Sequence, residues 1–365
     1  MKIKRLIQTY SKQLTNRYGS QLLPGHRKAL DAMLACRSHC GEFYTRCDSC
    51  HQQAVIPLSC GHRSCPQCQH HLGEAWQQKQ QQKLLPVTYF MVTFTLPYEL
   101  RDITWRHQNI VYDLMFKASV ETLQTLGKNN FNLKFGMTCV LHTHKRDKGF
   151  HPHIHIVLPG GGLNTDDQRL AWQALPQDFL INEYALARIF RGIFLRMLFE
   201  QSIELPYGLP KQWVSNIRNV GRGEKAYQYL SRYLYRGVIS ENDILTDHQG
   251  KVTFRYQDSQ TRKMTSKTQV AEEFLWALLK HVLPRGFRRV RDYGFLHGNA
   301  HKTLKQIQLL LHVRLPTKKL RKQKMTCSDC QTETRVVLVL PKRIPMQFRF
   351  YQPWVKSVTA TLAPS

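Results

Sequence analysis

Acidic residues are scarce in this chain. Its 365 residues include 25 Asp and Glu against 53 Lys and Arg, so the formal net charge is +28. This imbalance argues against an ordinary neutral metabolic enzyme, because a broadly basic surface attracts polyanions. Hydrophobic residues make up 42% of the chain, which is enough for a sizeable core and excludes a disordered basic tail. Nucleic acid is therefore the expected partner, ahead of an anionic membrane surface or a basic protein without a polyanionic partner.

Long apolar runs are missing as well. No stretch has the length of a secretory signal or of a membrane span, about 18 residues. The sequence therefore predicts no membrane partner and a cytoplasmic, nucleoid-associated protein. No internal repeat is present, and the length favours about two or three folded units. Changes in composition place their boundaries near residues 80 and 300, which gives units over 1–80, 81–300 and 301–365.

Cysteine is nearly absent outside two short regions. Seven of the ten cysteines lie within residues 36–68, two are Cys327 and Cys330, and Cys139 stands alone. In a chain without a secretion signal, this concentration indicates metal binding rather than disulfides. The sequence therefore predicts an N-terminal domain over residues 1–80 that binds structural Zn²⁺.

Two cysteine pairs in the first region have the spacing of zinc ligands. Cys47-x2-Cys50 and Cys65-x2-Cys68 are expected to coordinate one tetrahedral ion, each pair from one side. Further candidate ligands lie around these pairs and leave room for a second ion. They are Cys36, His39, Cys40, Cys60 and His62.

The C-terminal pair Cys327-x2-Cys330 supplies half of a zinc site, because no second cysteine pair follows it. A zinc ion there would need His297, His301 or another distant group to complete its four ligands. Residues 301–365 are thus expected to form a basic appendage with a candidate second metal site.

The middle of the chain mixes strand and helix patterns. β-branched and aromatic residues predict a buried strand within residues 87–96, and two further strands are expected over 136–144 and 151–158. Apolar residues at helical spacing predict helices around 111–118 and 186–197. The expected fold class is therefore α+β, with a sheet covered by helices.

Histidines alternate along the last of these strands. The period of a strand places His151, His153 and His155 on one face. If this strand forms a hairpin with the preceding one, His142 opposes His153 and His144 opposes His151, so all five histidines share a face. Such a platform is typical of a catalytic divalent ion, with His153 and His155 as ligands and His142 as the third. Imidazoles favour Mn²⁺ over Mg²⁺, although either ion is expected to serve.

A tyrosine-rich helix is expected over residues 224–236. Tyr229 and Tyr233 are four residues apart and therefore lie one turn apart on the same face, accompanied by Arg232 and Arg236. Alone, such a pair is typical of core packing. Beside a metal platform it indicates covalent catalysis, because a phenol can attack a phosphodiester when a metal ion polarises the phosphate oxygens.

A basic stretch near residue 290 is a candidate DNA-binding surface. Its arginines Arg288, Arg289 and Arg291 are interleaved with aromatic residues such as Phe287 and Tyr293. Cations that contact phosphates and rings that stack on bases are the usual means of binding single strands.

His153-Ile154-His155 combined with Tyr229-Leu230-Ser231-Arg232-Tyr233 resembles the two-tyrosine HUH endonucleases. Nearly the whole chain is similar to the rolling-circle transposases of the insertion sequence 91 family. Further motifs of the resemblance include Ser64-Cys65-Pro66-Gln67-Cys68, Leu141-His142-Thr143, Pro159-Gly160-Gly161-Gly162 and His281-Val282-Leu283-Pro284-Arg285-Gly286-Phe287.

The resemblance implies a two-tyrosine HUH nuclease and transposase core over residues 81–300, with a ferredoxin-like antiparallel sheet and helices on one face. It also implies a transposase that cleaves single-stranded DNA at element ends, forms a 5′-phosphotyrosine link at Tyr229 or Tyr233 and transfers the strand. Host replication machinery would supply DNA synthesis. His144, His151 or Gln228 is the reserve for the third metal ligand.

The chain departs from the family pattern in two places. Cys60-Gly61-His62-Arg63-Ser64 lacks the usual Arg-His directly before Cys-Pro, and no glycine follows Cys330. Two other functions remain as alternatives. One is a rolling-circle replication initiator with the same chemistry, and the other is a non-catalytic, zinc-dependent DNA-binding regulator.

Overall fold

The structure is a computed structural model. It describes residues 2–68, 70–164, 171–175, 182–235, 238–258, 261, 263–314 and 325–341. In this part of the chain, no helix is both long enough and apolar enough to cross a lipid bilayer.

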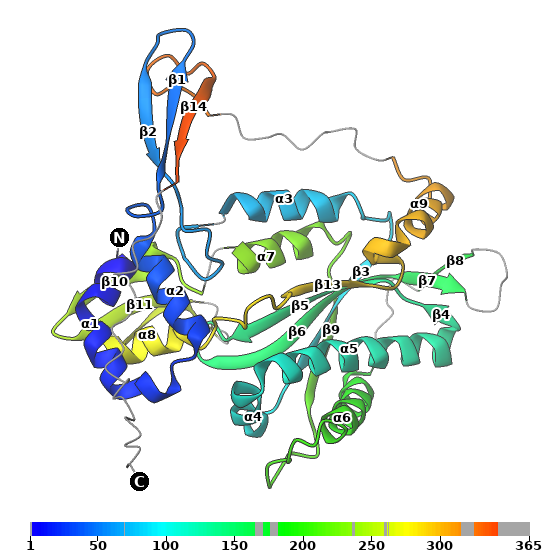
Figure 1. Cartoon of the computed structure of the whole chain (residues 1–365). Helices are drawn as coiled ribbons and strands as arrows, with labels where there is room; N and C mark the ends of the chain where they lie inside the picture. The colour runs from blue at the N-terminus through cyan, green and yellow to red at the C-terminus, as the bar shows by residue number, and fades with distance from the viewer. Residues whose placement is uncertain are drawn as a thin grey trace, which may run out of the picture.

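An antiparallel sheet of five strands forms the centre of the molecule, with the spatial order β13-β5-β6-β3-β9 (Figure 1). The three strands expected from the sequence are all present in it, as β3, β5 and β6. The bounds of the five strands are β3 Tyr89–Thr95, β5 Met137–His144, β6 Phe150–Pro159, β9 Val214–Asn219 and β13 Val290–Tyr293.

Helices cover both faces of this sheet. Phe90, Val92 and Phe94 of β3 point into a core shared with α5 (Gln108–Phe131) and α6 (Glu183–Phe199). On the other face, Tyr89 and Met91 pack under α7 (Glu224–Tyr235), and α3 (His70–Gln81) lies over α7 (Figure 1). The α+β class is confirmed. The resemblance implied helices on one face, whereas β3 has apolar side chains on both faces and buries each of them.

The N-terminal helices share a core with a later part of the chain. Leu6 of α1 (Lys2–Tyr18) and Leu30 of α2 (Pro24–Ala35) are buried with Phe254 and Phe274, which belong to a three-stranded sheet and to α8. The later elements are β10 Ile244–His248, β11 Lys251–Gln257, β12 Met264–Val270 and α8 Ala271–Leu279. The boundaries at residues 80 and 300 remain predictions, and this core joins the first unit to the second.

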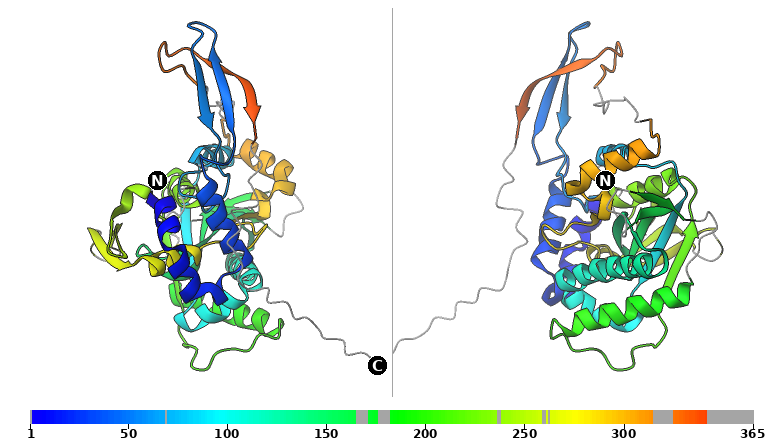
Figure 2. Two further views of the ribbon diagram at one scale, coloured as in Figure 1. Left: turned by 60° about the vertical axis from the view of Figure 1, so that its left-hand side comes forward. Right: turned by 90° about the vertical axis from the view of Figure 1, so that its right-hand side faces the viewer.

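A narrow arm extends from the body (Figures 1 and 2). The arm is a three-stranded antiparallel sheet with the order β14-β1-β2. β1 (Glu42–Cys47) and β2 (Gln53–Pro57) form a hairpin, and β14 (Thr334–Leu340) from the far end of the chain pairs with β1.

The remaining elements complete the body. α4 packs beside α5 and β6, and α9 packs on the turn that follows β13. A small sheet with the order β4-β7-β8 extends the core at the end of α5. The bounds are α4 Arg101–Arg106, α9 His301–Leu310, β4 Leu133–Lys134, β7 Gly161–Asn164 and β8 Trp172–Ala174.

Candidate active site and metal centres

Three histidines converge on the face of the sheet that α7 covers. His142 of β5 and His153 of β6 are direct cross-strand partners, as the hairpin register predicted, and His155 follows on the same face of β6. One ring nitrogen of each histidine lies within 4.8 Å of one nitrogen of each of the others. This spacing is that of a first coordination shell around a single ion.

The predicted register holds from Thr138 to His142 and is wrong only between this pair and the turn. An irregularity lies between His142 and His144, so that His144 opposes Phe150 instead of His151. The extra residue of a bulge turns the side chains that follow it, and the ring of His144 lies 4.9 Å from that of His281. Three of the five expected histidines therefore form the ligand cluster.

Hydrogen bonds fix the rings of two of these histidines. Nδ1 of His153 lies 2.7 Å from the carbonyl oxygen of His151, which can only accept, so this nitrogen donates and leaves Nε2 with its lone pair. Nδ1 of His155 lies 2.8 Å from Oγ1 of Thr93. Such second contacts orient metal-bound imidazoles and set their tautomer.

The electrostatic environment keeps the cluster neutral. Burial lowers the pKa of His153 to about 4. Burial, followed by the charges of neighbouring histidines, holds the pKa values of His142 and His155 well below the usual 6.5. Neutral imidazoles are the form that binds metal, so the three residues fit a divalent ion.

Tyr229 lies beside the histidines because of the way α7 packs. Ala226, Tyr227 and Leu230 are buried against the sheet, which turns Tyr229 to the flank of the helix. Its ring centroid is 6.3 Å from that of His142 and 6.1 Å from that of His155. The side chain is 46% exposed, so its hydroxyl is accessible to a large substrate.

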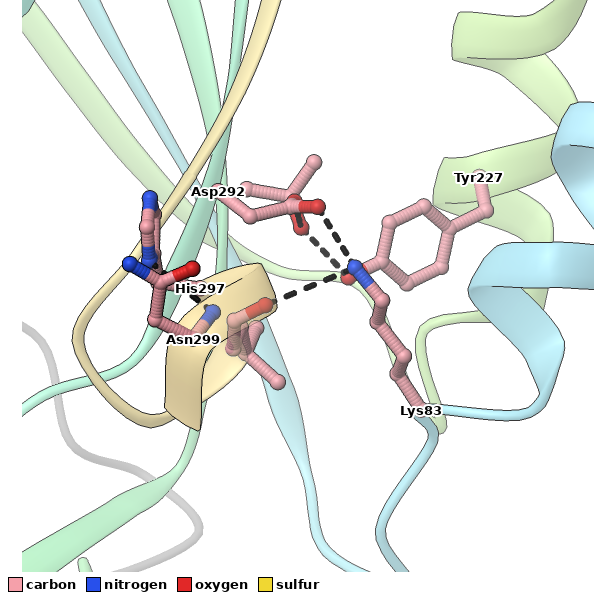
Figure 3. Close-up of polar contacts among 7 residues, drawn as sticks. Lys83, Tyr227, Asp292, His297 and Asn299 are labelled. Atoms are coloured by element: carbon pink, nitrogen blue, oxygen red, sulfur yellow. Dashed lines mark hydrogen bonds and ion pairs between the residues drawn. The ribbon is translucent and has the colours of Figure 1, made fainter. Parts of the chain in front are cut away.

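The other tyrosines of α7 have different positions. Tyr227 points away from the histidines, and its hydroxyl donates to Oγ1 of Thr138, which in turn donates to Asp292 (Figure 3). Lys83 forms an ion pair with the same carboxylate at 2.5 Å. The side chains of Tyr233 and Tyr235, together with Arg236, lie outside the described residues.

We expect Tyr227→Phe to leave the activity that the resemblance implies, cleavage of single-stranded DNA, intact, because its hydroxyl is buried in this network. The lost hydrogen bond should lower the free energy of unfolding by about 1 kcal/mol. Cleavage rate and urea denaturation measured on the same sample test both statements. A loss of cleavage at unchanged stability would assign the hydroxyl a chemical role that its position does not suggest.

Tyr229 borders two cavities. One, of about 800 Å³, extends from His142 and His153 to the β11 residues Arg255 and Tyr256. The other, of about 660 Å³, shares only Tyr229 with the first and includes Arg218, Arg222 and Lys225 among its lining residues. No motif in the sequence indicated Arg218, Arg255 or Tyr256, because β9 and β11 reach the site only through the fold.

The first group of cysteines differs from the predicted one. Cys36, Cys60, Cys65 and Cys68 place their sulfurs within 4.8 Å of one another, at the core of the N-terminal helices. The prediction that Cys47 and Cys50 share an ion with Cys65 and Cys68 is wrong. The β1–β2 hairpin carries Cys47 and Cys50 to the arm, away from the second pair.

The second group joins the two ends of the chain. Cys47, Cys50, Cys327 and Cys330 also lie within 4.8 Å of one another. The backbone N–H of Cys50, followed by the hydroxyl of Thr332, lowers the pKa of Cys47 to about 6 and favours the thiolate. The C-terminal pair was expected to need His297, His301 or another distant group, and Cys47 and Cys50, not either histidine, complete the group.

Two of the four histidine candidates for zinc, His297 and His62, have other contacts. Nδ1 of His297 accepts a hydrogen bond from the backbone of Asn299 (Figure 3). Nδ1 of His62 accepts from the backbone of Ser64 at 3.2 Å. Among the described residues, neither histidine belongs to a group that places its ligand atoms together.

Two family models match the chain in the regions that carry these sites. The Y2_Tnp model, described as "Putative transposase", matches residues 136–303, and the "Transposase zinc-binding domain" model of insertion sequence IS91 matches residues 5–96. The chain is 33% identical to "Putative transposase y4qJ" of Sinorhizobium fredii (strain NBRC 101917 / NGR234), covering 79% of this chain and 78% of that protein. The chain belongs to the two-tyrosine transposases of the IS91 family.

Further relatives differ in how similar they are to this transposase. The transposase for insertion sequence element IS801 of Pseudomonas savastanoi pv. phaseolicola is 26% identical, over 72% of this chain and 68% of that protein. A solved structure of TrwC complexed with a 27-mer DNA shares 12% identity and covers 62% of this chain and 75% of its own, with a TM-score of 0.26. The conjugative relaxase TrwC with oriT DNA gives the same score. The fold assignment rests on the sheet topology instead.

The arginines predicted to bind DNA separate onto different faces of the transposase. Arg289 lies on the histidine side, where its charge contributes to lowering the pKa of His142 and of His144. Arg291 points to the α5 side and forms an ion pair with Asp113 at 2.5 Å. Arg288 lines a cavity with Arg291 on that side, and Arg232 is exposed on α7. Arg289 is thus the member of the basic stretch that borders the active site.

Proposed function

We propose that this transposase nicks and rejoins single-stranded DNA at element ends through a 5′-phosphotyrosine intermediate. The observation that carries the proposal is the half-exposed Tyr229 beside three histidines whose ring nitrogens converge. This arrangement supplies a nucleophile and a divalent-ion site on one surface, as phosphodiester transfer requires.

His142, His153 and His155 would hold the ion. A bound Mg²⁺ or Mn²⁺ would polarise the phosphate oxygens of the scissile group. The contacts of His153 with the His151 carbonyl and of His155 with Thr93 hold the imidazoles in place before DNA arrives. Such preorganisation lowers the cost of reaching the reactive geometry.

Tyr229 acts as the attacking group in this proposal. Its oxygen forms a bond to phosphorus while the bond from phosphorus to the 3′ oxygen breaks. The phenol loses a proton and the departing oxygen gains one, so a free 3′-hydroxyl and a 5′-phosphotyrosine result. Reversal by a second 3′-hydroxyl rejoins the strands. The charge of Arg218 lowers the pKa of His155, and that of Arg289 lowers the pKa of His142. In this proposal the same two charges offset the negative charge of the transition state.

Tyr233 is proposed as the second nucleophile. It follows Tyr229 by one helical turn, about 6 Å along the axis of α7. Both phenols can then serve one metal centre without occupying the same attacking position. Each would hold one DNA end, which allows two covalent ends in a single reaction.

The DNA strand is proposed to run through the two cavities on either side of Tyr229. Arg218, Arg222 and Lys225 offer phosphate contacts in one cavity, while Arg255 and Tyr256 form the far wall of the other. Cationic side chains that contact the DNA phosphates, and aromatic rings on which bases stack, suit an unpaired strand. The host replication machinery remains a prediction from the resemblance, and nucleoid association remains a prediction from the sequence.

The decisive test is to incubate the purified protein and a divalent ion with labelled single strands from its own element ends. A covalent protein–DNA adduct and a free 3′-hydroxyl are expected. Neither product, with DNA binding retained, would favour the regulator alternative. Nicking confined to an origin sequence would favour the replication initiator.

Tyr256→Leu should weaken binding of single-stranded DNA about tenfold, because leucine preserves packing but removes a ring on which a base can stack. Tyr184→Leu is a matched control, since Tyr184 is exposed on α6 across the sheet. Fluorescence anisotropy with a labelled oligonucleotide measures both. Equal DNA affinities for the two variants would show that Tyr256 of β11 does not contact the DNA strand.

A further inference from the structure

The arm brings together two cysteine pairs from opposite ends of the sequence. Sγ of Cys47 lies 3.4 Å from that of Cys330, and Sγ of Cys50 lies 3.5 Å from those of Cys327 and Cys330. These separations exceed the roughly 2.05 Å of a disulfide bond. They approach the roughly 3.8 Å between sulfurs that a tetrahedral zinc site with bonds of about 2.3 Å requires. The sulfur positions thus match one shared ion.

The two pairs repeat the same backbone hydrogen bonds. The N–H of Cys47 donates to the carbonyl oxygen of Gln52 at 2.9 Å, five residues ahead. The N–H of Cys327 donates to the carbonyl oxygen of Thr332 at 2.8 Å, with the same spacing. Two separate segments therefore form the same tight turn and point their thiols toward each other.

Each turn also has a strained backbone at the same position. The residue after the second cysteine has a left-handed backbone in both, with φ of 60° at His51 and 59° at Gln331. This conformation is unfavourable for residues other than glycine and persists where the surroundings require it. Gln331 thus takes the conformation that the missing glycine after Cys330 would have provided. A shared ion would explain this strain, because both turns must then point their thiolates at one position.

Apart from the backbone pairing with β1, little else holds β14 against the hairpin. The side chains of Val337 and Val339 are each 52% exposed, so pairing with β1 buries little apolar surface. The ion pair of Arg335 with Asp48, at 2.9 Å, is exposed on both sides and contributes little stability in water. An edge strand with so few buried contacts needs another source of stability.

We propose that Cys47, Cys50, Cys327 and Cys330 bind a second structural zinc ion, separate from that at Cys36, Cys60, Cys65 and Cys68. The ion links the C-terminal strand to the N-terminal hairpin, although Cys50 and Cys327 are 277 positions apart in the sequence. The zinc-binding family model ends at residue 96 and does not include the C-terminal pair. The zinc domain of this chain is therefore completed by its other end.

Zinc counting tests this proposal. The intact protein, purified without chelator, should contain two zinc ions per chain. Cys327→Ser combined with Cys330→Ser should leave one, and Cys47→Ser combined with Cys50→Ser should also leave one. Cys40→Ser is the matched control and should retain two, because Cys40 lies outside both groups and serine can keep its hydrogen bond to the Ala35 carbonyl.

Other counts contradict the proposal. A single ion in the intact chain, or two in the Cys327→Ser/Cys330→Ser variant, would overturn it. A count that falls by one for each pair removed and by two when all four cysteines are replaced would show that the pairs bind separate ions and would overturn it as well.

Cysteine alkylation of the wild-type protein provides a test that does not depend on the folding of a variant. With zinc bound, Cys50 and Cys330 should react slowly with iodoacetamide although Cys50 is exposed. Graded chelation should release the four arm thiols together, as followed by peptide mass spectrometry. Release of Cys327 and Cys330 while Cys47 and Cys50 stay protected would contradict a shared ion.

Discussion

Phenylalanine in place of Tyr229 is expected to abolish formation of the covalent DNA adduct on the first strand. The substitution removes the oxygen that we propose attacks phosphorus and leaves the ring, whose centroid lies 6.1 Å from that of His155, to preserve packing. Single-strand binding should stay within about twofold of the wild type, since a half-exposed hydroxyl contributes little to the contact area. Gel mobility of the labelled adduct and peptide mass spectrometry of the attached residue measure the effect.

Tyr227→Phe is the matched control for this experiment because it removes a hydroxyl from the same helix at a buried position. Tyr233→Phe should abolish transposition, and the double Tyr229→Phe/Tyr233→Phe variant should form no adduct at all. An adduct mapped to Tyr227 or Tyr235 would show that another face of α7 carries the chemistry.

His153→Ala is expected to lower the cleavage rate by about 10³-fold or more. A Lewis acid at the phosphate supplies several kcal/mol of transition-state stabilisation, and about 4 kcal/mol corresponds to roughly a thousandfold. His153 is one of three converging ligands, so its loss should also weaken binding of Mn²⁺ in the absence of DNA. Electron paramagnetic resonance titration of free Mn²⁺ measures this second effect independently of activity.

Thr93→Val provides a graded comparison. It keeps the shape of the side chain but removes the hydroxyl that lies 2.8 Å from Nδ1 of His155. Loss of such a supporting contact should cost about 10 to 100-fold in metal affinity or rate, less than loss of a ligand. Full Mn²⁺ affinity and cleavage in His153→Ala would exclude the histidine platform from the mechanism, whatever Thr93→Val does.

The sequence by itself determined the local chemistry of this protein. The strand period of His153 and His155 fixed their common face, and the short turn before them fixed His142 as the partner of His153. The apolar positions of residues 224–235 likewise fixed which side of α7 is buried, and so left Tyr229 accessible. Each of these follows from interactions among residues close together in the chain.

Only the tertiary structure decided which distant groups meet. The spacing of a Cys-x2-Cys pair specifies a turn with two thiols but not its partner, so Cys47 and Cys50 join Cys327 and Cys330 instead of Cys65 and Cys68. The bulge that turns His144 toward His281, and the placement of Arg255 and Tyr256 opposite the histidines, likewise have no local signal. These contacts depend on how separate strands and helices pack, and the free energy of that packing is shared among residues far apart in sequence.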